Sequence, residues 1–175
     1  MKKLSLAFLL SLICNYTFAC EEGVKRAVDS LLNNLCSQTS SKVIRKVRTS
    51  VQVAKNCSTD AKVYTAEKLV SGLRSCHTSS AVIGTARSMI DLCDRDMQCA
   101  EAVMMSFARG NSCGHTSSAM IGIINGIKGT VARNPFNSVK NEAAIALANI
   151  LSSSCHTSSV VYAAEQALID ISLCE

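Results

Sequence analysis

A short phrase occurs four times along this chain, and it limits the possible folds more than any other feature. Each copy begins with a cysteine and ends in Thr-Ser-Ser, and the four cysteines are Cys36, Cys76, Cys113 and Cys155. Successive cysteines are 40, 37 and 42 residues apart. Such a recurrence is typical of repeat proteins, in which each unit buries its apolar face against its neighbours. The spacing therefore predicts four structural units of about 40 residues.

The segments between the copies have the apolar periodicity of amphipathic helices. Val43, Val47, Val51 and Ala54 recur every three or four residues, which places them on one helix face. Residues that favour helix N-caps also occur halfway between the copies, so each unit is expected to contain two helices. The expected helices cover approximately residues 21–35, 39–55, 58–75, 78–92, 97–110, 116–132, 136–152 and 157–173.

Composition and connection length favour an all-α fold. The chain is 48% hydrophobic but only 4% aromatic and has one proline, which suits helices packed through small side chains better than strands. We expect antiparallel helix hairpins stacked as a short, disulfide-stapled α-solenoid, with a compact helical bundle as the alternative. Alternating helix directions would place all four Thr-Ser-Ser phrases on one edge. Ala119, Gly122, Gly126 and Gly129 form a stripe that would let a neighbouring helix approach closely.

The first 19 residues have the features of an export signal. Lys2 and Lys3 precede an apolar stretch from Leu4 to Ile13, and Thr17-Phe-Ala19 resembles a cleavage site. We therefore expect a signal peptide at 1–19 and one mature domain at 20–175, exported to the periplasm or secreted. Cys20 would become the first residue, where bacterial lipoproteins carry their lipid, so an outer-membrane lipoprotein anchored through Cys20 is the alternative.

Cysteine pairing is expected because export leads to an oxidising compartment. A disulfide needs Cα atoms within about 7 Å, so bridges should form within one edge and between adjacent units. On the Thr-Ser-Ser edge this predicts Cys36 with Cys76 and Cys113 with Cys155.

The opposite edge leaves more than one arrangement open. Cys57 is expected to pair with Cys93 or Cys20, and Cys99 with Cys93 or elsewhere, while Cys174 is difficult to place. Nine of the ten cysteines follow the predicted signal. This odd number leaves room for a lipid at Cys20, one free thiol, or a bridge within a homodimer.

The three histidines are the best candidates for metal ligands. His77, His115 and His156 each lie beside a repeat cysteine. The simpler interpretation is that Thr-Ser-Ser caps the next helix and that the histidine is merely exposed beside it. Packed helices lie about 10 Å apart, whereas zinc ligands converge at roughly 2 Å from one ion. We therefore expect no bound metal and no other cofactor.

Charge points to a binding surface rather than to catalysis. The chain has neither G-x-S-x-G nor H-E-x-x-H, and we expect no enzymatic activity. Residues 36–76 carry eight basic and two acidic side chains, and residues 155–175 carry three acidic and no basic ones. A solvated helix face is the simplest interpretation, but such asymmetry can also orient a protein on an anionic surface. The candidate binding residues are Lys42, Arg45, Lys46 and Arg48.

These observations predict an exported helical repeat protein that binds another macromolecule or has a structural role in the cell envelope. A Cys/His metal-binding or thiol-redox envelope protein is the alternative function. The expected partner is an envelope or extracellular macromolecule, with an anionic one as an option that the basic segment favours. A nucleic acid is not expected, since the basic segment contains no aromatic residue for base stacking. Membrane contact is expected only through a lipid at Cys20.

Overall fold

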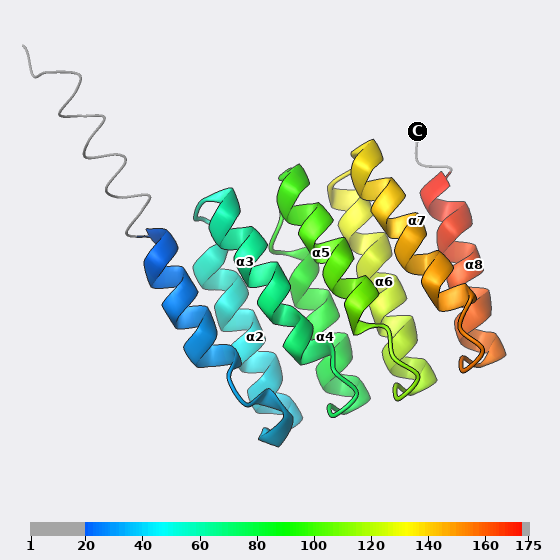
Figure 1. Ribbon diagram of the computed structural model, residues 1–175, viewed down its shortest axis with the longest axis horizontal. Coiled ribbons are helices and arrows are strands. Elements are labelled where there is room, and N and C mark those ends of the chain that lie inside the picture. Colours follow the sequence, from blue (N-terminus) through cyan, green and yellow to red (C-terminus); the bar gives the residue numbers. More distant parts are fainter. Residues whose placement is uncertain (1–19, 173–175) are drawn as a thin grey trace, which may run out of the picture.

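The computed structural model describes residues 20–172, and every regular element in that range is helical (Figure 1). The predicted signal peptide at 1–19 and Cys174 lie outside the described residues. The described part contains eight helices and two short 3-10 segments. They are the first helix at 20–32, η1 (Leu35–Ser37), α2 (Ser40–Ala54), α3 (Thr59–Leu69), η2 (Val70–Leu73), α4 (Ser79–Ile90), α5 (Met97–Gly110), α6 (Ser117–Arg133), α7 (Asn137–Leu151) and α8 (Ser158–Ser172).

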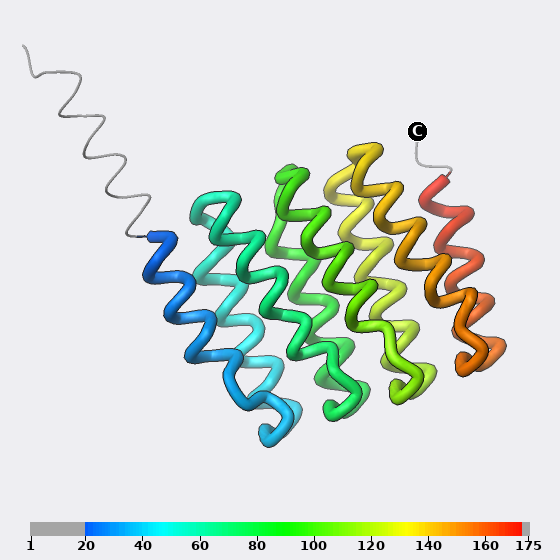
Figure 2. Tube along the Cα trace, viewed as in Figure 1, coloured from blue at the N-terminus to red at the C-terminus, as the bar shows by residue number. Residues whose placement is uncertain are grey.

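The helices form two parallel rows, as the trace in Figure 2 shows. The even row contains α2, α4, α6 and α8, and each of these helices packs on the next member of the row. The odd row contains the first helix, α3, α5 and α7, and α5 packs on both α3 and α7. One odd-row helix and the even-row helix that follows it make one unit. The predicted all-α solenoid of four hairpin units is therefore confirmed.

Small residues set the spacing within the even row. A Cβ placed on Gly122 of α6 would lie 2.6 Å from Cγ1 of Ile83 in α4, and one on Gly129 would lie 2.6 Å from Cδ1 of Ile90. These distances are far below van der Waals contact, so a larger residue at either position would force the neighbouring isoleucine to shift. The close helix contact expected from the glycine stripe is confirmed.

Apolar side chains fill the space between the rows. The predicted stripe of α2 is buried, with Val43, Val47 and Ala54 fully inaccessible and Val51 nearly so. None of the helices in the described residues has the length and apolar character that a membrane span requires.

The third expected helix differs from the prediction at its end. The α-helical hydrogen bonding stops at Leu69, and Val70–Leu73 winds more tightly as a 3-10 helix. Gly72 lies in this turn against α4, where a Cβ would come within 2.8 Å of Oγ1 of Thr85. The prediction of one continuous helix over 58–75 was wrong because this contact depends on tertiary packing, which local periodicity does not report.

Candidate binding surfaces at the edge and at the end of the stack

The four Thr-Ser-Ser phrases lie along one edge, where every even-row helix begins. A serine of one unit and a threonine of the next are hydrogen-bonded through their hydroxyl groups at each of the three junctions. The pairs are Ser40 and Thr78 at 2.6 Å, Ser79 and Thr116 at 2.6 Å, and Ser117 and Thr157 at 2.9 Å. The predicted edge is confirmed, and these six hydroxyl groups already bind one another.

Capping by the threonines is confirmed at two helices and not at a third. Oγ1 of Thr78 accepts from the backbone N–H of Ala81, and Oγ1 of Thr116 accepts from that of Ala119. Thr39 is the N-cap residue of α2, but its side chain makes no capping hydrogen bond.

Each histidine binds the end of a preceding helix. Nε2 of His77 donates to the carbonyl of Ser71, and Nε2 of His115 donates to that of Gly110, at 3.0 and 2.9 Å. Carbonyl groups near the C-terminus of a helix lack partners within the helix, and these rings satisfy one each. The expectation that the histidines are merely exposed was wrong: all three are half-buried.

His156 occupies the same place in the last unit but binds a side chain. Its Nε2 donates to Oδ1 of Asn111 at 3.0 Å. Burial lowers the pKa of His156, and the charge of His115 lowers it further. The folded protein therefore favours the neutral ring of His156, which can donate one hydrogen bond and accept another.

Four disulfides fasten the units, and they follow the predicted edges. Cys36–Cys76 and Cys113–Cys155 lie on the Thr-Ser-Ser edge, and both are confirmed. They join the first unit to the second and the third to the fourth.

On the opposite edge, Cys20–Cys57 also joins the first two units, while Cys93–Cys99 closes only the loop between α4 and α5. Of the alternatives left open, the structure contains Cys57 with Cys20 and Cys99 with Cys93. The bridge to Cys57 also corrects the lipid anchor at Cys20, because one sulfur atom cannot form both a disulfide and a thioether to a lipid.

One group of three possible metal ligands comes together in the described residues. The ligand atoms of Cys36, Cys76 and His77 all lie within 4.8 Å of one another. Metals bind the thiolate form of cysteine, and here the two sulfur atoms are bonded to each other. Nε2 of His77 is also engaged with Ser71. The three histidines do not form a cluster of their own in this part of the chain.

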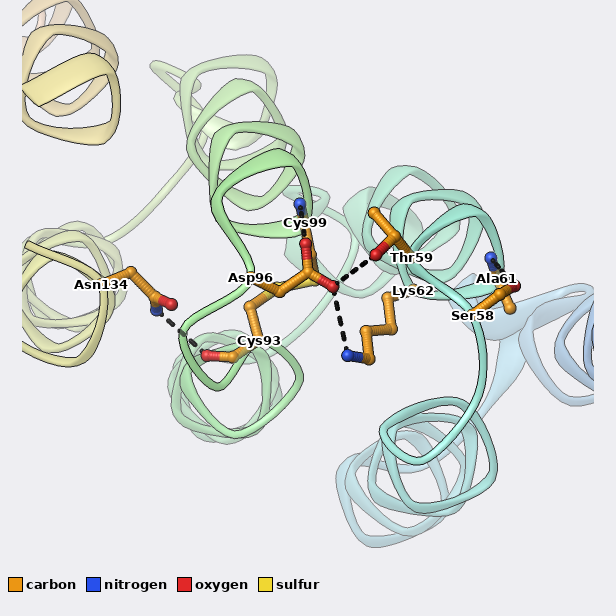
Figure 3. A network of polar contacts seen from close by, with 8 residues as sticks. All are labelled: Ser58, Thr59, Ala61, Lys62, Cys93, Asp96, Cys99 and Asn134. Atoms are coloured by element: carbon orange, nitrogen blue, oxygen red, sulfur yellow. Dashed lines mark hydrogen bonds and ion pairs between the residues drawn. A yellow bond between two sulfur atoms is a disulfide. The ribbon is translucent and has the colours of Figure 1, made fainter. Parts of the chain in front are cut away.

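The edge opposite the Thr-Ser-Ser phrases holds a polar network that joins the second and third units (Figure 3). Oδ2 of Asp96 accepts from Oγ1 of Thr59 at 2.8 Å and from Nζ of Lys62 at 3.1 Å, and Oδ1 accepts from the backbone N–H of Cys99. Burial raises the pKa of Asp96, but the hydrogen bonds from Thr59, Cys99 and Lys62 outweigh it and lower the pKa overall. Nearby, Nδ2 of Asn134 donates to the carbonyl of Cys93.

An open groove lies along the exposed side of α2, at the beginning of the even row. It has a volume of about 650 Å³, and we call it the α2 groove. Its lining combines apolar carbon, hydroxyl and amide groups, and two arginines. The residues are Ser41, Ile44, Arg45, Arg48, Thr49, Gln52 and Val53.

The predicted basic residues are divided between this groove and the rest of α2. Arg45 and Arg48 line it, and both are exposed. Lys42 is exposed elsewhere on the helix, and Lys46 is half-buried. The contribution of Ile44, Thr49, Gln52 and Val53 was missed. Their helical spacing with Arg45 was visible in the sequence, but not that α2 begins the row and leaves this side uncovered.

Comparison with protein-family models, with curated proteins and with solved structures gave no match.

Proposed function

We propose that this protein is an exported binding module of the cell envelope or the extracellular space, and that its α2 groove holds an acidic helix of a second protein molecule. The single observation that carries the proposal is the position of Arg45 and Arg48 in an open groove at the end of a helix row. The residues that line the groove extend from Ser41 to Val53 along α2 alone, so a helix lying beside α2 can contact all of them. The two guanidinium groups favour carboxylates on that helix, because arginine binds them in a bidentate fork.

The chemistry of the two surfaces supports this choice over the Thr-Ser-Ser edge. Along that edge six hydroxyl groups, the three histidines and the four cysteines already have partners within the chain. The arginines of the α2 groove are exposed, and Ile44 and Val53 add apolar surface to its lining. The proposal is one of binding without catalysis. Four disulfides are typical of a fold that must persist in an oxidising environment, which agrees with export.

Immobilised poly-glutamate tests the binding chemistry. We expect the oxidised mature protein to be retained at low salt and released as salt rises, because exposed charges are screened within about 10 Å at 0.1 M ionic strength. Changing Lys42, Arg45, Lys46 and Arg48 to glutamate should abolish retention, and Arg45→Glu with Arg48→Glu alone should remove most of it.

The matched control is Arg74→Glu with Arg109→Glu, which makes the same change in net charge at two exposed arginines outside the α2 groove. This variant should still be retained. Equal loss in the control and in the Arg45/Arg48 variant would show that overall charge, and not the groove, binds the acidic polymer. Undiminished retention of the fourfold variant would also contradict the proposal.

A further inference from the structure

The contacts inside the even row follow a fixed register. Counted from the threonine of each phrase, Ile83 is five places along α4 and packs on Gly122, six places along α6. Ile90, at place twelve, packs on Gly129 at place thirteen. Ile44 at place five of α2 contacts Gly84 at place six of α4 in the same way.

The ion pair between α6 and α8 uses the same register. Lys128 is at place twelve and Asp170 at place thirteen. Place five therefore contacts place six between α2 and α4 and between α4 and α6, and place twelve contacts place thirteen between α4 and α6 and between α6 and α8. Place eight likewise faces place ten, since Cβ of Ala86 in α4 lies 3.2 Å from the Cβ position of Gly126 in α6.

In α8, the last helix of the row, the same two contact positions are exposed, because in the described residues no further helix packs on them. Places five and twelve of α8 are Tyr162 and Ile169, which are 63% and 49% exposed. Place eight is Val47, Ala86 and Ile124 in the three earlier helices, all buried, but it is the exposed Glu165 in α8. A polar residue at the end of a repeat array serves solubility, and this accounts for Glu165. Solubility does not explain why Tyr162 and Ile169, which are large and exposed, stand at the two positions that contact the next helix elsewhere in the row.

The first helix of the row has the complementary set of residues. Places six, ten and thirteen of α2 are Arg45, Thr49 and Gln52, and all three line the α2 groove beside Arg48. The α8 end thus presents two apolar side chains around a carboxylate, and the α2 end presents a groove with two guanidinium groups. The two ends match in register and are opposite in charge.

We infer that the acidic helix held by the α2 groove is α8 of a second copy of this chain, so that molecules join head to tail and continue the even row. This rests on the proposed function and names its partner. In the register of the internal contacts, Tyr162 lies on Arg45, Glu165 lies over Thr49 beside Arg48, and Ile169 lies on Gln52. The contact is heterologous, since different surfaces meet, and it leaves a free end on each side. Association therefore continues beyond the dimer.

Sedimentation of the oxidised mature chain over a concentration series tests this inference. The mean mass of the wild type should rise past that of a dimer at low salt and fall back at high salt. Arg45→Glu with Arg48→Glu should keep the protein monomeric, and so should Glu165→Arg. Tyr162→Ala should weaken association without changing the charge. The Arg74→Glu, Arg109→Glu control should associate like the wild type.

Mixing the two blocked variants separates a lost contact from a damaged fold. The Glu165→Arg protein retains a basic α2 groove, and the Arg45→Glu, Arg48→Glu protein retains an acidic α8, so the mixture should associate although neither variant does alone. A mixture that remains monomeric would overturn the inference. A wild type that stays monomeric, or that stops at a dimer, would overturn it as well.

The proposed function can survive such a result. If the wild type is monomeric but is still retained on poly-glutamate through Arg45 and Arg48, the groove binds an acidic helix of a different protein, and only its assignment to a second copy is wrong. If the protein is also not retained on poly-glutamate, the proposed function is wrong as well.

Discussion

Nζ of Lys62 in α3 lies 3.1 Å from Oδ2 of Asp96, the N-cap residue of α5, and this ion pair joins the second unit to the third. Both side chains are mostly buried, at 15% and 12% exposure. In the described residues no disulfide links different helices at this junction, because Cys93–Cys99 closes only a loop. The middle of the stack therefore depends on packing and on polar contacts to Asp96.

Replacing Asp96 with alanine should destabilise the protein by about 2 kcal/mol. The change removes an N-cap, typically worth about 1 kcal/mol, and leaves Lys62 without its partner in a partly buried place. Chemical denaturation under non-reducing conditions measures the loss. Asp94→Ala is the matched control, because Asp94 is an exposed carboxylate in the same loop. Equal stabilities of the two variants would contradict the role given to Asp96.

Protonation of the Asp96 carboxylate should lower the stability of the fold in acid. Because the pKa of Asp96 is lower in the folded protein, its contribution to stability is complete above the unfolded pKa of about 3.9 and is lost as pH falls through the folded value. Denaturation midpoints measured from pH 6 downward should decline less steeply below about pH 4 in Asp96→Asn than in the wild type. Parallel curves would show that Asp96 does not carry this dependence.

Alanine should have opposite effects at Gly122 and Gly23. In an exposed helix this substitution stabilises by up to about 1 kcal/mol, and nothing lies within 4 Å of the Cβ position at Gly23. At Gly122 the new methyl group meets Ile83, including its backbone Cα at 3.3 Å, and overpacking of this kind costs about 1–3 kcal/mol. Thermal or chemical unfolding of the two variants gives the comparison. A stabilising Gly122→Ala would mean that α4 and α6 are not in such close contact.

His156 should make the protein less stable in mild acid. Its pKa is lower in the folded state, so its contribution is complete above the unfolded pKa of about 6.5 and is lost as pH falls through the folded value. The free energy of unfolding should therefore fall between pH 7.5 and 5.5. His156→Gln keeps a donor for Asn111 but does not titrate, so it should flatten this dependence. An unchanged slope would assign the pH effect to other groups.

The repeat period was enough to predict the architecture, and the reason is physical. Four copies of one phrase require four similar junctions, and a hairpin stack is the arrangement that places them on one edge. The pairs Cys36–Cys76 and Cys113–Cys155 followed from that edge and from the reach of a disulfide. On the opposite edge Cys57 had two possible partners, Cys20 and Cys93, since spacing alone does not distinguish the neighbours on its two sides.

The properties that depend on side-chain direction were not predictable in the same way. The carbonyl groups that bind His77 and His115 belong to the end of the preceding helix, and their position depends on how that helix meets the next. The role of Asp96 depends on Lys62, 34 residues earlier. The α2 groove arises from the end of a row, which no local pattern marks. The basic residues in the sequence predicted that α2 is the helix with the candidate binding surface, but they did not predict which side of α2 is uncovered.

Non-reducing peptide mapping of the oxidised protein is the most direct test of the stack of four hairpin units. We expect disulfide-linked peptides that join Cys36 to Cys76, Cys113 to Cys155, Cys20 to Cys57 and Cys93 to Cys99. A bridge between the two edges, such as Cys36 to Cys57, would contradict the stack, because the length of a whole helix separates those positions.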